Sequence, residues 1–133
     1  MTDTLLGSCL CGAVKYQLSA PLQAVSHCHC SQCRKSHGAA FASYASVRRT
    51  DLHLLQGADR LMSYPSSEGI LRQFCGQCGS SLFWSNRLGD YPDWISIALG
   101  TLDTTVTLPW QKHVYVESKA SWYALQDDRP QGQ

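Results

Sequence analysis

Short runs in which apolar and polar residues alternate recur along the chain. Between residues 13 and 18, Val14, Tyr16 and Leu18 alternate with a lysine and a glutamine, so the three apolar side chains share one face. Because successive side chains of an extended chain point to opposite faces, this pattern predicts a half-buried β-strand. The sequence as a whole predicts a mainly β protein, with further strands at 41–47, 52–55, 61–64, 70–74, 81–84, 94–99 and 113–116.

Turn signals separate these runs and indicate how the strands are connected. Segments rich in glycine, proline and polar residues are typical of turns, and their spacing favours short antiparallel sheets; they occur at 56–59, 65–69, 89–92 and 100–103. One short helix is expected at 31–36, because Ser31 can cap its start and Gly38 lies just beyond its end. The tail at 127–133, which contains a proline and a glycine, is expected to be frayed.

Length and composition limit the class of protein. Of the 133 residues, 44% are hydrophobic and 16% are charged, which is enough apolar material for one core and excludes an intrinsically disordered chain. The length predicts a single domain over 1–133, for which a folded part at about 7–125 and short flexible ends are expected. No oligomeric state is predicted.

Charge and hydropathy limit the kinds of partner that the protein can bind. Eleven basic against ten acidic residues give a formal net charge of +1, which creates no strong field for a polyanion, so no nucleic-acid partner is expected. Residues 1–7 lack the pattern of a signal peptide, and the chain has no apolar run of about 18 residues. We therefore expect a cytoplasmic protein with no membrane partner.

Seven cysteines are unusual for a chain with these properties. A reducing cytosol disfavours structural disulfides, and an odd number of cysteines cannot pair completely. Short gaps between cysteines are instead a metal-binding signature. The clusters are a C-x-C, a C-x-C-x-x-C and a C-x-x-C motif, formed by Cys9 and Cys11, by Cys28, Cys30 and Cys33, and by Cys75 and Cys78.

The first and last clusters suit one closed metal site. Tetrahedral zinc holds thiolates at about 2.3 Å, so its ligands must lie within about 4 Å of one another. A tight turn brings the two cysteines of C-x-x-C together, and on an extended segment those of C-x-C leave on the same face. We expect Cys9, Cys11, Cys75 and Cys78 to hold a structural Zn²⁺ that stabilises the fold. Reduced core thiols or a redox pair are the alternatives.

The middle cluster has no fourth cysteine with which to complete a tetrahedron. Three protein ligands and one open corner are typical of catalytic zinc, so Cys28, Cys30 and Cys33 are the candidate catalytic residues and the ligands of a second Zn²⁺. His27 and His29 are expected on the opposite face of the extended segment from the neighbouring cysteines.

Three other residues near this cluster could contribute. His37 lies one helical turn beyond Cys33 and is a candidate fourth ligand or acid/base, with an exposed or hydrogen-bonded histidine as the alternative. Arg34 and Lys35 could lower the cost of thiolate charge, or form a solvated surface pair.

An open zinc site made of three thiolates is better suited to holding a thiol than to strong Lewis-acid chemistry. A free thiol with a pKa of about 8.5 is mostly protonated at pH 7, whereas a metal-bound thiol is deprotonated. The reactive fraction would rise roughly thirtyfold, which is worth about 2 kcal/mol in barrier. The hypothesis is that a small-molecule thiol meets a carbonyl electrophile at this site.

The ordered clusters and the residues around them resemble the glutathione-dependent formaldehyde-activating enzyme family, a domain shared with centromere protein V. The resemblance covers about 7–125 and is carried by GSCLCGAV at 7–14, CHCSQCRK at 28–35, FCGQCGSSL at 74–82 and HVYVESKASW at 113–122. It implies a mainly β, Mss4-like, zinc-stapled fold, with a structural zinc on the outer clusters and a catalytic zinc on the middle one. It also implies a carbon-sulfur lyase that condenses glutathione with formaldehyde to S-hydroxymethylglutathione.

Other readings remain open from the sequence. The substrate could be another sulfur adduct or carbonyl compound, the chain could be a non-enzymatic zinc-binding interaction module, or the thiolates could bind iron. Candidates for gripping the carboxylates of glutathione are Arg48, Arg49, Arg72 and Lys112, with ordinary surface charges as the alternative. The four tryptophans, Trp84, Trp94, Trp110 and Trp122, could line a pocket or pack in the core.

Overall fold

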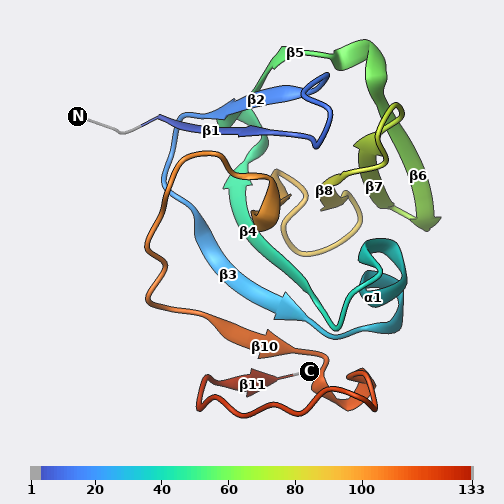
Figure 1. Ribbon diagram of the computed structural model, residues 1–133, viewed down its shortest axis with the longest axis vertical. Helices are drawn as coiled ribbons and strands as arrows, with labels where there is room; N and C mark the ends of the chain where they lie inside the picture. The colour runs from blue at the N-terminus through green and yellow to red at the C-terminus, as the bar shows by residue number, and fades with distance from the viewer. Residues whose placement is uncertain (1–3, 133) are drawn as a thin grey trace.

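The computed structural model describes residues 4–132 and consists mainly of two β-sheets (Figure 1). The smaller sheet is antiparallel, with the strand order β1-β2-β5. The larger sheet has eight strands in the order β11-β10-β3-β4-β9-β8-β7-β6. In Figure 1 the small sheet lies at one end of the molecule, and β10 and β11 lie at the other.

The strands are short, as the alternating runs predict. The bounds are β1 Leu5–Ser8, β2 Lys15–Leu18, β3 Gln23–Cys28, β4 Ala42–Arg48, β5 Leu52–Gln56, β6 Leu61–Ser67, β7 Ile70–Cys75, β8 Ser81–Asn86, β9 Trp94–Ala98, β10 Lys112–Val114 and β11 Gln131–Gly132. The helix α1 spans Ser31–His37, and single 3-10 turns occur at Arg49–Asp51, Ala58–Arg60, Leu99–Thr101 and Val116–Ser118. The predicted mainly β fold with one short α-helix is confirmed for residues 4–132. None of the described helices has the length and apolar character needed to span a bilayer.

The sheets are not wholly antiparallel. Strand β10 runs parallel to both β3 and β11, while the other neighbours in the large sheet are antiparallel. It also ends before the predicted 113–116 run does, because Tyr115 has a φ of 56° and Val116 begins a 3-10 turn. Strands β1 and β3 are not signalled by alternation and owe their extended form to the strands on which they pair.

The C-terminal segment differs from the expected frayed tail. Residues 131 and 132 form β11, and the backbone N–H of His113 donates to the carbonyl of Pro130 at 2.8 Å. Pairing with β10, which is distant in sequence, supplies order that the local composition does not predict. Flexible ends were expected on either side of about 7–125, but β1 already begins at Leu5; residues 1–3 and 133 lie outside the described residues.

Helix α1 begins at Ser31, as expected, but Ser31 is not its N-cap. Its N-cap is Cys30, whose Sγ accepts a hydrogen bond from the N–H of Cys33. It ends as predicted, with Gly38 in the left-handed region and its N–H donating to the carbonyl of Arg34. A cysteine rather than a serine therefore caps the start of the helix.

Each cysteine set lies beside a buried cluster. Cys9 and Cys75 pack in the larger cluster, which includes Tyr16 and Phe83, whose rings meet edge-on at 5.2 Å. Cys28 and Cys33 pack in the smaller one, with Ala42, Tyr44 and Ala98. The two candidate metal centres are thus held on rigid parts of the fold.

Candidate metal centres

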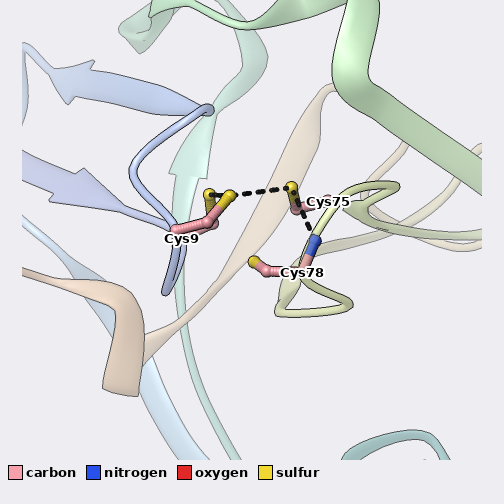
Figure 2. Close-up of side chains that lie close together, drawn as sticks. Cys9, Cys75 and Cys78 are labelled. Carbon is pink, nitrogen blue, oxygen red and sulfur yellow. Dashed lines mark hydrogen bonds between the residues drawn. The ribbon is translucent and has the colours of Figure 1, made fainter.

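The first centre brings together Cys9, Cys11, Cys75 and Cys78, whose sulfurs all lie within 4.8 Å of one another. The Sγ atoms of Cys9 and Cys11 are 3.7 Å apart, and those of Cys11 and Cys75 are 3.9 Å apart. Four sulfurs bound tetrahedrally at about 2.3 Å would lie about 3.8 Å from one another, so the donors fit zinc. Figure 2 shows the side chains of Cys9, Cys75 and Cys78 converging from two separate loops.

The Cys9 loop is a turn and not the extended segment expected from C-x-C. The N–H of Gly12, which has a φ of 80°, donates to the carbonyl of Cys9 at 3.1 Å. The N–H of Val14 then donates to the Cys9 sulfur at 3.3 Å. The turn, rather than strand alternation, brings Cys11 beside Cys9.

The Cys75 loop folds in a similar way at the end of β7. The N–H groups of Gln77 and Cys78 both donate to the Cys75 sulfur at 3.4 Å. Gly79, with a φ of 82°, takes the chain out of the turn. Hydrogen bonds from the side chain and backbone of Ser80 lower the pKa of Cys78 to about 5. Such donors stabilise thiolates, the form that a metal binds.

The second centre gathers Cys28, Cys30 and Cys33, whose sulfurs also lie within 4.8 Å of one another. Cys28 ends β3, Cys30 caps α1 and Cys33 lies in its first turn, so the strand-to-helix junction places all three. Cys28 and Cys33 are buried and Cys30 is half-buried. Three converging sulfurs fit one face of a thiolate-bound zinc ion.

Arg72, on β7, contacts this centre and is not the ordinary surface charge considered as its alternative. It is 8% exposed, and its Nη1 and Nη2 lie 3.7 and 3.8 Å from the Cys33 sulfur. Burial would lower the pKa of Arg72, but the hydrogen bonds and the charge of Cys33 outweigh it and raise that pKa. The sequence carries no local signal for this contact, because the two residues lie 39 positions apart.

The thiols of the second centre ionise unequally. Hydrogen bonding from Cys28, together with Cys30 and Arg72, outweighs burial and lowers the pKa of Cys33 to about 5. Interaction with Cys33 and burial raise the pKa of Cys28. One thiolate therefore forms readily at Cys33, opposite the guanidinium.

The histidines of this region do not belong to the group of donors formed by the three cysteine sulfurs of the second centre. His27 bonds to Ser43 and Gln111, and His29 bonds to His113, so both rings lie on the face away from the cysteines, as alternation predicts. The Nε2 atom of His37 lies 2.9 Å from the Tyr44 hydroxyl. The hydrogen-bonded alternative for His37 is the arrangement seen, and no fourth ligand among residues 4–132 completes the centre.

A cavity of about 710 Å³ lies next to the second centre, between α1 and strands β6 to β8. Arg72 belongs both to its lining and to the Cys33 contact, and thereby connects the two. The described lining includes two cationic groups, from Lys35 and Arg72, and no carboxylate. The cavity therefore suits an anionic small molecule. Other lining residues include Gln32, His37, Tyr44 and Tyr64.

The remaining cationic candidates lie elsewhere. Arg48 stacks over the Trp94 ring at 4.9 Å, and Arg49 donates to the carbonyl of Pro92. Lys112 belongs to a different cavity, of about 480 Å³.

The tryptophans do not wall the first cavity. Trp84 and Trp94 line the smaller cavity, while Trp110 and Trp122 are 88% and 72% exposed. The aromatic residues that line the larger cavity are tyrosines and phenylalanines, which the sequence did not single out, while Trp84 packs against the buried cluster that contains Cys28 and Cys33.

Comparison with known proteins decides the family. The family model described as glutathione-dependent formaldehyde-activating enzyme matches residues 4–118, which include all seven cysteines. The chain belongs to this family. A Halomonas elongata protein that carries the family's name is 26% identical over 129 residues, covering 92% of this chain and 81% of its own length. An uncharacterised lyase of Schizosaccharomyces pombe is 27% identical over 90 residues, or 68% of this chain and 64% of its own.

A solved structure of a Rhodobacter sphaeroides protein supports the fold of this member of the glutathione-dependent formaldehyde-activating enzyme family. Its TM-score is 0.63 at 27% sequence identity, and the match covers 76% of this chain and 90% of the other.

Proposed function

We propose that this chain is a zinc-dependent carbon-sulfur lyase that condenses glutathione with formaldehyde to give S-hydroxymethylglutathione. The observation that carries the proposal is the cluster of three cysteines next to a carboxylate-free cavity with two cations, in a chain of this family. The proposal treats residues 1–133 as one zinc-binding domain with two metal sites.

The two sites have different roles in this proposal. Cys9, Cys11, Cys75 and Cys78 hold a structural zinc, because their four sulfurs leave no free corner in a tetrahedron. Cys28, Cys30 and Cys33 hold the catalytic zinc, because they supply three donors. When bound there, zinc supplies the deprotonation of a substrate thiol near neutral pH.

Charge in the cavity orients the substrate. Glutathione carries two carboxylates and one ammonium group at neutral pH, so its net charge is negative. Lys35 and Arg72 offer complementary charge from opposite elements, α1 and β7, and Gln32 adds an amide. Such a lining favours an anionic thiol over a neutral or cationic one.

The bond changes involve two proton transfers. The substrate thiol loses its proton to solvent, its sulfur forms a bond to the formaldehyde carbon as the carbonyl π pair moves to oxygen, and that oxygen takes up one proton. The hydroxyl of Tyr44 and the imidazole of His37 are hydrogen-bonded at 2.9 Å and both line the cavity. We assign this pair to proton delivery at the developing alkoxide.

The test follows exchange between glutathione, formaldehyde and their adduct by NMR. The zinc-loaded protein should accelerate exchange, Cys30→Ala should abolish the acceleration while staying folded, and Ser31→Ala, an exposed neighbour, should keep it. Metal analysis should give about two zinc per chain and about one in Cys30→Ala. Background exchange with two zinc would point to another thiol or carbonyl substrate. Background exchange with one zinc would point to a non-enzymatic zinc module.

A further inference from the structure

A chain of hydrogen bonds runs behind the three-cysteine centre to the C-terminal segment. The Nε2 atom of His29 lies 2.8 Å from Nδ1 of His113, and Nε2 of His113 lies 3.1 Å from a carboxylate oxygen of Asp127. His29 is fully buried and His113 is 1% exposed. These hydrogen bonds thus link His29, which lies between the candidate ligands Cys28 and Cys30, to Asp127 near the end of the protein.

The carboxylate sets the direction of every bond in this chain. An ionised carboxylate only accepts, so Nε2 of His113 donates to Asp127 and its Nδ1 is left as an acceptor. That acceptor takes the proton on Nε2 of His29. The remaining ring nitrogen of His29, Nδ1, is then a lone pair, and this buried atom has no hydrogen-bond partner among the described residues.

Ordering of His29 also orders the cysteines on either side of it. Side chains alternate along an extended backbone, so a ring held on one face directs the Cys28 and Cys30 sulfurs to the other. The backbone N–H of His29 donates to the carbonyl of Val114 at 3.0 Å, which holds the same peptide to β10. The ring of Phe41 packs 5.0 Å from that of His29 and limits its rotation.

Asp127 is itself held in place. The N–H of Arg129 donates to one of its oxygens at 3.1 Å, and the Arg129 guanidinium lies 3.6 Å from the other. The hydrogen bond from His113, followed by that from the Arg129 backbone, lowers the pKa of Asp127, so the carboxylate is ionised at neutral pH. Asp127 lies beyond residues 4–118, the part of the chain that the family model matches.

We propose that Asp127 is a positioning residue for the three-cysteine centre and acts through His113 and His29. It selects the tautomers of both histidines, holds the His29 ring away from the sulfurs, and so keeps Cys28 and Cys30 aimed at one point. The inference rests on the proposed function only in that the three cysteines bind a metal.

The test refolds the chelator-treated protein in increasing concentrations of Co²⁺, whose thiolate absorption reports the filling of each centre. The variants are Asp127→Ala, the conservative Asp127→Glu, and Asp128→Ala as a matched control. In Asp127→Ala the Co²⁺ at the three-cysteine centre should bind about tenfold more weakly and with an altered spectrum. This is the size of effect typical of residues that orient metal ligands. The affinity of the four-cysteine centre for Co²⁺ should not change. Asp128→Ala should match the wild type, and Asp127→Glu should restore part of the lost affinity.

Three results would overturn the inference. Asp127→Ala could bind both ions as the wild type does, which would remove the positioning role and leave the proposed function intact. It could instead lose both centres together with thermal stability, which would make Asp127 a general structural residue. A wild-type protein that takes up only one Co²⁺ would overturn the proposed function itself.

Discussion

The guanidinium of Arg72 faces the sulfur of Cys33, with both terminal nitrogens within 3.8 Å of it. The same side chain donates from Nε to the Ser66 hydroxyl at 3.0 Å and from Nη2 to Gln32 at 3.5 Å. It therefore connects β7 to α1 in the lining of the cavity. Three thiolates and one Zn²⁺ carry a net charge of −1, which a buried guanidinium compensates.

Arg72→Met should lower kcat/KM for glutathione by about 10- to 100-fold. The substitution keeps the apolar stem but removes charge-assisted hydrogen bonds worth about 1.5–3 kcal/mol. Arg72→Lys is the matched control and should recover part of the loss, because it keeps the charge without the planar fork. The measurement is the NMR exchange rate over a range of glutathione concentrations. An Arg72→Met enzyme with wild-type kcat/KM would contradict this role.

Loss of the first metal should unfold the protein. A structural zinc supplies on the order of 10 kcal/mol, which is comparable to the whole stability of a domain. Cys75→Ser removes a donor that is fully buried and should abolish cooperative thermal unfolding, as should a strong chelator added to the wild type. Circular dichroism and calorimetry provide the measurement, and Cys30→Ala is the control that should stay folded. A folded, metal-free wild type would show that the first site does not stabilise the protein.

Alkaline pH should destabilise the protein through Tyr16. Burial raises the pKa of Tyr16 from an ordinary value of 10.0 to about 12, despite the hydrogen bond to Thr101. The folded state therefore keeps a proton that the unfolded state loses, so this contribution is complete below pH 10 and disappears as the pH rises to about 12. Two pKa units correspond to about 2.7 kcal/mol.

Urea unfolding of the zinc-loaded protein between pH 8 and 12 measures this effect. Tyr16→Phe keeps the ring that packs on Phe83 but has no ionisable hydroxyl. As the pH rises through this window, the free energy of unfolding of the wild type should fall relative to that of Tyr16→Phe. Parallel curves for the two proteins would exclude Tyr16 as the source of the alkaline loss.

Gly57→Ala should destabilise the protein by about 2 kcal/mol, or roughly 5–10 °C in Tm. Gly57 has a φ of 83°, and a Cβ at this position would overlap the backbone carbonyl of Ala13. That carbonyl lies next to the Cys11 turn, so neither backbone can move without disturbing the first centre. Gly100→Ala is the matched control, because a Cβ there meets nothing within 4 Å. Equal Tm values for the two variants would refute the argument.

Local signals in the sequence were sufficient for the fold class and for the grouping of cysteines within each motif. Alternation predicted most strands because burial of one sheet face imposes a period of two on residues that are neighbours in sequence. The cysteine spacing predicted which sulfurs meet within each motif, because neighbouring cysteines of a motif are at most three positions apart. The helix end at Gly38 was predicted for a similar reason, because a helix commonly ends at a residue with left-handed backbone angles and glycine adopts these most easily.

Contacts between distant residues were decided by the tertiary structure. Arg72 meets Cys33 only because the fold brings β7 to α1, and Asp127 meets His113 only because strand pairing places the tail beside β10. The same pairing turned an expected loose end into β11. Burial and charge compensation at the second centre depend on these contacts. No period or spacing in the sequence predicts these contacts, because the fold of the whole backbone decides which groups lie near a given guanidinium or carboxylate.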